Sequence, residues 1–152
     1  MTNRPIAVRR MSLLSLLLCL VSLGACARDC TPEVRDGWIR LPPGAMAMMA
    51  AGFGRIENHC ATPATIVAAS SPAFGETSLH ETRIVEGISR MRAVPELRIA
   101  PDGAAVLKPG GLHLMLMDPR TPLQPGSRIA VEFTLGDGRK LLGEFVVRNA
   151  GD

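Results

Sequence analysis

The sequence is poor in aromatic residues, with no tyrosine, one tryptophan and four phenylalanines in 152 residues. Proteins that bind single-stranded nucleic acid stack bases on aromatic side chains beside a basic surface. The net charge of +3 does not indicate such a surface, because Arg4, Arg9 and Arg10 lie in an N-terminal segment that we expect to be removed. The remaining basic and acidic residues balance, so we expect no nucleic-acid partner.

Common catalytic motifs are also absent. The sequence contains no recognisable Ser-His-Asp arrangement, no glycine-rich phosphate loop and no hydrolytic zinc motif. It also lacks the closely spaced Cys, His and Met of a blue-copper electron-transfer site, which needs a cysteine thiolate. We therefore expect neither an enzyme nor an electron-transfer cupredoxin.

Long apolar runs are confined to the N-terminus. A basic start precedes an apolar run from Leu13 to Leu23, which is too short to span a bilayer and predicts a signal peptide over residues 1–25. Leu23-Gly24-Ala25-Cys26 resembles a lipoprotein lipobox, which would place a lipid on Cys26. Ala25-Cys26-Ala27 also fits ordinary signal peptidase, and we favour the lipoprotein. Residues 26–32 would then be a short tether to a domain at 33–150.

Cysteine is scarce, with four residues in the chain. Cys19 leaves with the signal and Cys26 is either acylated or removed, so Cys30 and Cys60 remain as a pair. In an oxidising compartment such a pair predicts a disulfide, which would contribute roughly 3–4 kcal/mol in the chain-entropy model. Metal ligation by these two residues is the less favoured alternative.

Helical periodicity is nearly absent, and Pro and Gly recur about every ten residues, which indicates many short strands. One face of 128–135 carries alternating apolar residues, and Gly136-Asp137-Gly138 turns the chain into 140–148 as a hairpin. So many strands predict an all-β antiparallel sandwich or Greek-key barrel. The expected strands are 33–40, 51–58, 64–70, 77–84, 88–93, 96–100, 104–108, 112–117, 128–135 and 140–148.

The chain has three histidines, and the spacing of two of them is its most informative feature. The sequence reads His80-x10-Met91-x21-His113-x-Met115, and alternation places His113 and Met115 on one strand face. Imidazole with neutral thioether, and no thiolate, is a ligand set suited to Cu(I). We predict a shallow copper site formed by His80, Met91, His113 and Met115 at one end of the barrel.

This spacing resembles the motif of the periplasmic PCu(A)C copper chaperones, and every interval matches. Residues 33–148 share the resemblance, including the Leu107-Lys108-Pro109-Gly110-Gly111 segment before His113. The resemblance implies a cupredoxin-like fold and a Cu(I) chaperone. It would deliver copper to the dinuclear copper centre of cytochrome c oxidase, directly or through a thiol-bearing assembly partner. Copper storage or resistance without a dedicated recipient is the alternative.

The expected location is the periplasm, with the lipid-bearing form held at the periplasmic face of the outer membrane, because Ala27 replaces the aspartate that retains inner-membrane lipoproteins.

Other sulfur and aromatic residues stay outside the four-residue motif. We interpret Met117 as a supporting or core residue, His59 as a loop residue and Trp38 as a core or near-site aromatic. Met46-Ala47-Met48-Met49 is either an apolar start to the next strand, which we favour, or an auxiliary copper-collecting patch.

Overall fold

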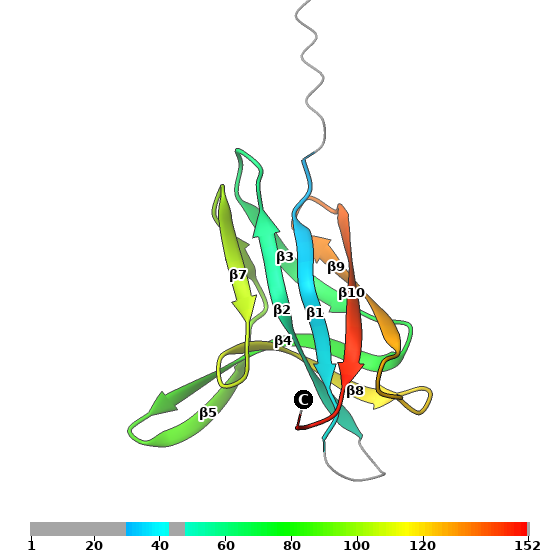
Figure 1. Ribbon diagram of the computed structural model, residues 1–152. Helices are drawn as coiled ribbons and strands as arrows, with labels where there is room; N and C mark the ends of the chain where they lie inside the picture. Colours follow the sequence, from blue (N-terminus) through cyan, green and yellow to red (C-terminus); the bar gives the residue numbers. More distant parts are fainter. Residues whose placement is uncertain (1–29, 43–47, 152) are drawn as a thin grey trace, which may run out of the picture.

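The computed structural model describes residues 30–42 and 48–151, which contain ten β-strands (Figure 1). The prediction of an all-β fold is confirmed. The strands are β1 (Glu33–Arg40), β2 (Met49–Asn58), β3 (Ala64–Ser70), β4 (Phe74–Val85), β5 (Ile88–Ala93), β6 (Leu97–Ile99), β7 (Gly103–Leu107), β8 (Leu112–Pro119), β9 (Arg128–Leu135) and β10 (Lys140–Arg148).

All ten expected strands are present, and five begin or end elsewhere than predicted. The clearest differences are at β2, β4 and β8, each of which is longer than its alternation pattern indicated. Each extension has a partner strand: Met49, in the extension of β2, lies opposite Met117, and Phe74, in the extension of β4, lies opposite Pro119, in that of β8. Cross-strand hydrogen bonding thus carries the strands past the point where local patterning stops.

The sheet is continuous in the order β5-β4-β8-β2-β1-β10-β9-β3-β6, with β7 also pairing with β2. All pairs are antiparallel except β1 with β10. In Figure 1, β1, β2, β7 and β10 form one layer, and β3, β4 and β9 cross behind it. The predicted hairpin of β9 and β10 is present, and the Leu135 N–H donates a hydrogen bond to the Arg139 carbonyl oxygen at its turn.

The inner face of the sheet holds the hydrophobic core. Val131, Phe133 and Leu135, which share the predicted apolar face of β9, are at most 2% exposed. Leu114 and Leu116 of β8 are fully buried in the same cluster. Because strand side chains alternate, Met115, which lies between these two leucines, must face outward.

A β-bulge in β1 decides which of its residues reach that outer face. The register shifts by one residue between Arg35 and Trp38, where Asp36 has a φ of 52°. A one-residue insertion reverses the alternation beyond it. Ile39 therefore enters the core at 0% exposure, while Trp38 and Arg40 lie on the face opposite the core.

Gly54 makes the close approach at this bulge possible. Its φ is 150°, and an added Cβ would lie 3.0 Å from the carbonyl oxygen of Arg35. Any other residue at position 54 would strain the crossing of β1 and β2.

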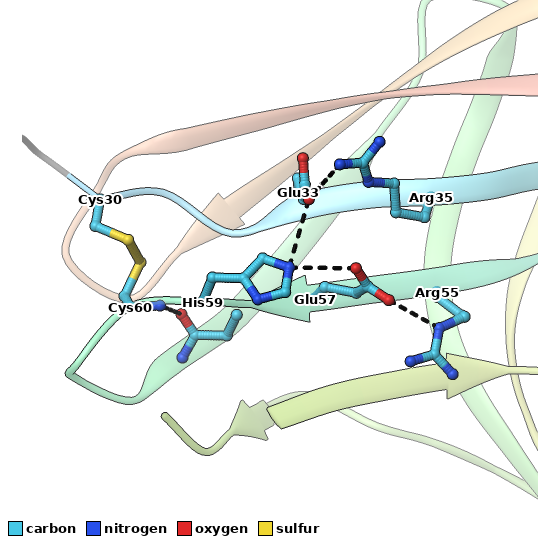
Figure 2. A network of polar contacts seen from close by, with 8 residues as sticks. Cys30, Glu33, Arg35, Arg55, Glu57, His59 and Cys60 are labelled. Atoms are coloured by element: carbon cyan, nitrogen blue, oxygen red, sulfur yellow. Dashed lines mark hydrogen bonds and ion pairs between the residues drawn. A yellow bond between two sulfur atoms is a disulfide. The ribbon is translucent and has the colours of Figure 1, made fainter. Parts of the chain in front are cut away.

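The predicted disulfide between Cys30 and Cys60 is confirmed, with a Cα–Cα distance of 5.5 Å. It ties the segment before β1 to the segment after β2 (Figure 2). Within residues 30–42 and 48–151, no helix is long and apolar enough to cross a bilayer.

Candidate metal centre

His113 and Met115 project from the outer face of β8, as alternation predicted. Their neighbours Leu114 and Leu116 are 0% exposed in the core, whereas His113 is 8% exposed and Met115 is half-buried. The two predicted ligands on this strand therefore share one face of the sheet, opposite the core.

His80 lies beside His113 on the neighbouring strand. β4 and β8 pair antiparallel with His80 directly opposite His113, and the two ring centroids are 6.2 Å apart. Burial, followed by repulsion from His113, lowers the pKa of His80 below that of an ordinary histidine. The geometry therefore favours a neutral His80 imidazole, which is the form that binds a metal.

Met91 comes from β5, the edge strand beyond β4. It lies opposite Thr82, and Ala93 of the same strand lies opposite His80, so Met91 shares the outer face with the two histidines. Its side chain is 52% exposed. The four predicted ligands therefore come from three strands on one face. Met91 is the most exposed of the four.

A hydrogen bond fixes the orientation of His113. Its Nδ1 lies 2.9 Å from the carbonyl oxygen of Gly111. A carbonyl only accepts, so Nδ1 carries the proton and Nε2 keeps its lone pair. A ligating histidine commonly donates its second ring nitrogen in this way, which sets the ring orientation and tautomer.

An aromatic support lies behind His113. The ring of Phe53 is 6.4 Å from that of His113, and Trp38 packs on Phe53 at 4.6 Å. Arg40 lies over Phe53 and Arg148 lies over Trp38, with guanidinium-to-centroid distances of 5.1 and 5.3 Å. Trp38 is thus a near-site aromatic, one of the two roles that the sequence left open.

An open cavity of about 500 Å³ lies over this part of the face. It is lined by three of the predicted ligands, Met91, His113 and Met115. His80 does not line the cavity but lies beside His113, which does. The lining also includes Met49 and Arg40, which were not predicted as site residues. The Met46–Met49 cluster was the available signal for Met49; Arg40 gave none, because its position depends on the bulge in β1.

His59 lies at the other end of β2, just after the strand, as predicted for a loop residue. Its Nε2 is 3.3 Å from Oε2 of Glu57 and 3.5 Å from Oε1 of Glu33 (Figure 2). Arg55 and Arg35 pair with these carboxylates at 3.0 and 2.6 Å. The hydrogen bond from Arg55 is the main reason that the pKa of Glu57 is lowered. The carboxylates already have cationic partners.

The sequence also matches a known protein family. Residues 33–147 match the LpqE-like family of predicted lipoproteins. The chain belongs to the LpqE-like family. It is also 35% identical over 134 residues to the predicted lipoprotein Lxx21020 of Leifsonia xyli subsp. xyli (strain CTCB07), covering 83% of this chain and 78% of that one.

Two solved structures have the same fold as this LpqE-like protein. Cu(I)-bound DR1885 from Deinococcus radiodurans is 27% identical, with a TM-score of 0.63 over 82% of this chain and 83% of that one. The apo PCuAC domain from PmoF1 is 20% identical, with a TM-score of 0.62 over 76% and 92%. The resemblance to PCu(A)C proteins and the cupredoxin-like fold predicted from it are confirmed.

Proposed function

We propose that this LpqE-like protein is a Cu(I) metallochaperone whose cargo is held by His80, Met91, His113 and Met115. The observation that carries the proposal is the gathering of two imidazoles and two thioethers, from three strands, on one face beside an open cavity. The solved relative DR1885, at 27% identity, is a Cu(I)-bound protein.

The donor set supports Cu(I) over harder cations. Thioether sulfur and imidazole nitrogen are soft or intermediate donors, and none of the described residues that line the cavity carries a carboxylate. With metal–nitrogen bonds of about 2 Å, two imidazoles can share an ion when their centroids are about 6 Å apart. The separation of His80 and His113, 6.2 Å, meets this condition. Methionine also stays able to bind where a free thiol would be oxidised.

The exposure of the site supports transfer of the ion to another protein. Met91 is 52% exposed, so an incoming ligand can reach the bound metal from the side of β5. Each of the four side chains has a holding role, and none is left as a base or nucleophile, so we propose no enzymatic activity. The recipient we propose is the dinuclear copper centre of cytochrome c oxidase, reached directly or through a thiol-bearing assembly partner.

A transfer assay tests the recipient. The Cu(I)-loaded protein is mixed with the apo copper-bearing domain of the oxidase subunit, and formation of the copper centre is followed by its absorption. We expect transfer from the wild type and none from a His113→Ala/Met115→Leu variant, which should fail to load. Loaded protein that yields copper to a small Cu(I) chelator but never to the oxidase domain would favour storage or resistance instead.

We also propose that the protein is exported to the periplasm and anchored through lipid on Cys26, at the periplasmic face of the outer membrane. Membership of a family of predicted lipoproteins supports the lipid anchor. Several acyl chains hold a protein stably at a membrane, whereas one binds only marginally. Wild-type protein should therefore fractionate with outer membranes and Cys26→Ser should not; an unmodified N-terminus at residue 28 in the mass spectrum would refute the anchor.

A further inference from the structure

We infer that Met49 and Met117 form an outer thioether site through which Cu(I) enters and leaves the pocket. This inference rests on the proposed function, because it concerns the route to the same four ligands. It assigns a role to Met49, the first residue of β2 and the last of the Met46–Met49 cluster, for which the sequence left two interpretations open; Met46 and Ala47 lie outside the described residues.

The register of β2 and β8 brings the two sulfur-bearing side chains together. Met49 lies directly opposite Met117, and Ala51 lies directly opposite Met115. Opposed residues of antiparallel strands share a face, with Cβ atoms about 4.5–5.5 Å apart, and diagonal neighbours are about 7–8 Å apart. Met115, Met117 and Met49 are therefore successive neighbours on the outer face, and Met115 is the proposed inner ligand.

The cavity joins the outer methionine to the inner site. Met49 lines the same cavity as Met91, His113 and Met115. Ala51, opposite Met115, is small, so no large side chain of β2 separates Met49 from the inner ligands. A copper ion can thus reach the histidines while remaining beside a thioether.

The burial of Met49 argues against a packing role. Its side chain is 50% exposed, whereas its strand neighbour Ala50, on the core side, is 7% exposed. Exposure rises from 8% at His113 to 50% at Met49, so Met49 lies toward the outside of the cavity. A methionine placed to fill the core would be buried, as Leu114 and Leu116 are.

The exchange that we propose is a ligand substitution. A bond forms between Cu(I) and the Met49 sulfur, one bond to an inner ligand breaks, and the metal keeps its charge. All the ligands are neutral, so neither a proton nor an electron moves. The alanine at position 51 leaves room for both sets of donors to contact the ion during the exchange.

Methionine methyl groups report the two sites separately. Exported protein carrying ¹³C-labelled methionine methyls is titrated with Cu(I) alone and followed by NMR, with signals assigned from single Met→Leu variants. We expect the first equivalent to shift the Met91 and Met115 methyls, and to broaden or shift those of Met49 and Met117 through exchange. Met48 is adjacent in the chain and 64% exposed, but it lies before β2 and outside the register that pairs Met49 with Met117, so its methyl should not move.

Transfer kinetics provide the second measurement. Leucine preserves the apolar bulk of methionine but cannot bind the metal, so Met49→Leu should slow both loading and release of Cu(I) about tenfold. That change corresponds to about 1.4 kcal/mol in the barrier. The equilibrium affinity, set by the four inner ligands, should stay near that of the wild type. Met48→Leu is the matched control and should exchange copper at the wild-type rate.

The outcomes separate this inference from the proposed function. Shifts at Met91 and Met115 with an unmoved Met49 methyl, or wild-type rates in Met49→Leu, would overturn the outer site and leave the chaperone proposal intact. An equal loss of rate in Met48→Leu would also overturn it, since the effect would not belong to the cavity. Unmoved Met91 and Met115 methyls would overturn the proposed function and the outer site together.

Discussion

The two ends of β2 carry contrasting histidine clusters on the same outer face of the sheet. At one end, Met49 and Ala51 adjoin neutral thioethers and imidazoles. At the other, Glu57 and Arg55 take part in a charged network with His59 and Glu33. The six residue steps from Ala51 to Glu57 along an extended strand correspond to about 20 Å.

The difference between the ends shows that a histidine acquires its role from its neighbours. His113 donates Nδ1–H to a backbone carbonyl and leaves Nε2 available beside sulfur donors. His59 turns its Nε2 toward two carboxylates whose charges are already balanced by arginines. Such exposed pairs contribute little to stability, because water and salt screen their charges. The first end is suited to hold a soft cation, and the second joins chain segments beside the disulfide.

Removing one histidine from each end of β2 should produce the largest difference between the two ends, measured as Cu(I) affinity. His113→Ala deletes a proposed ligand, so its Cu(I) affinity should fall by more than the roughly 10–100-fold that loss of an outer-shell partner costs. His59→Ala is the matched control and should bind Cu(I) as the wild type does. Competition with a chromophoric Cu(I) chelator measures both affinities.

The quadruple variant His80→Ala, Met91→Leu, His113→Ala, Met115→Leu extends this test to the whole ligand set. It should bind no Cu(I) at the site, while its circular dichroism still shows a folded β-protein. One Cu(I) bound with unchanged affinity would show that the metal lies elsewhere, and equal losses in His59→Ala and His113→Ala would abolish the distinction between the two ends.

The disulfide provides a second contrast, between stability and binding. The Cys30→Ser/Cys60→Ser variant loses a cross-link of sequence separation 30, which should lower the free energy of unfolding by roughly 3–4 kcal/mol. Urea unfolding followed by circular dichroism measures the loss. Because the cross-link lies at the charged end, the folded variant should keep its Cu(I) affinity; a large fall in affinity below the unfolding transition would show that the two ends are coupled.

The pKa of His80 gives the smallest expected effect and sharpens the account of the copper-facing end. An NMR titration of the apo protein should place the midpoint of His80 below the ordinary value of about 6.5. His113→Asn removes the repulsion and should raise the midpoint only part of the way, because burial is the larger cause. Full restoration would show that repulsion dominates.

The sign of the associated stability change follows from the direction of the shift. The folded state binds the His80 proton more weakly than the unfolded state, so this residue destabilises the fold as pH falls below the ordinary histidine pKa. The penalty is complete once the pH lies below the lowered folded value. A His80→Gln variant should therefore lose less stability than the wild type between neutral and mildly acidic pH.

Local patterns predicted most of the fold and the strand face on which two of the proposed ligands lie. Alternation over 128–135 and the Gly-Asp-Gly turn predicted the β9–β10 hairpin, and both strands have the predicted bounds. The same period of two predicted that His113 and Met115 face away from Leu114 and Leu116. These features depend on the backbone of one strand and its next turn, so neighbouring residues are sufficient to encode them.

The sequence by itself determined which residues could ligate a soft metal, that the chain would form short strands, and that Cys30 and Cys60 would pair. Only the tertiary structure decided which distant residues joined the cavity. Met49 reaches it through the pairing of β2 with β8, and Arg40 through a bulge that reverses the alternation of β1. Register between strands far apart in the chain depends on the whole sheet, because a shift of one residue turns every later side chain to the opposite face.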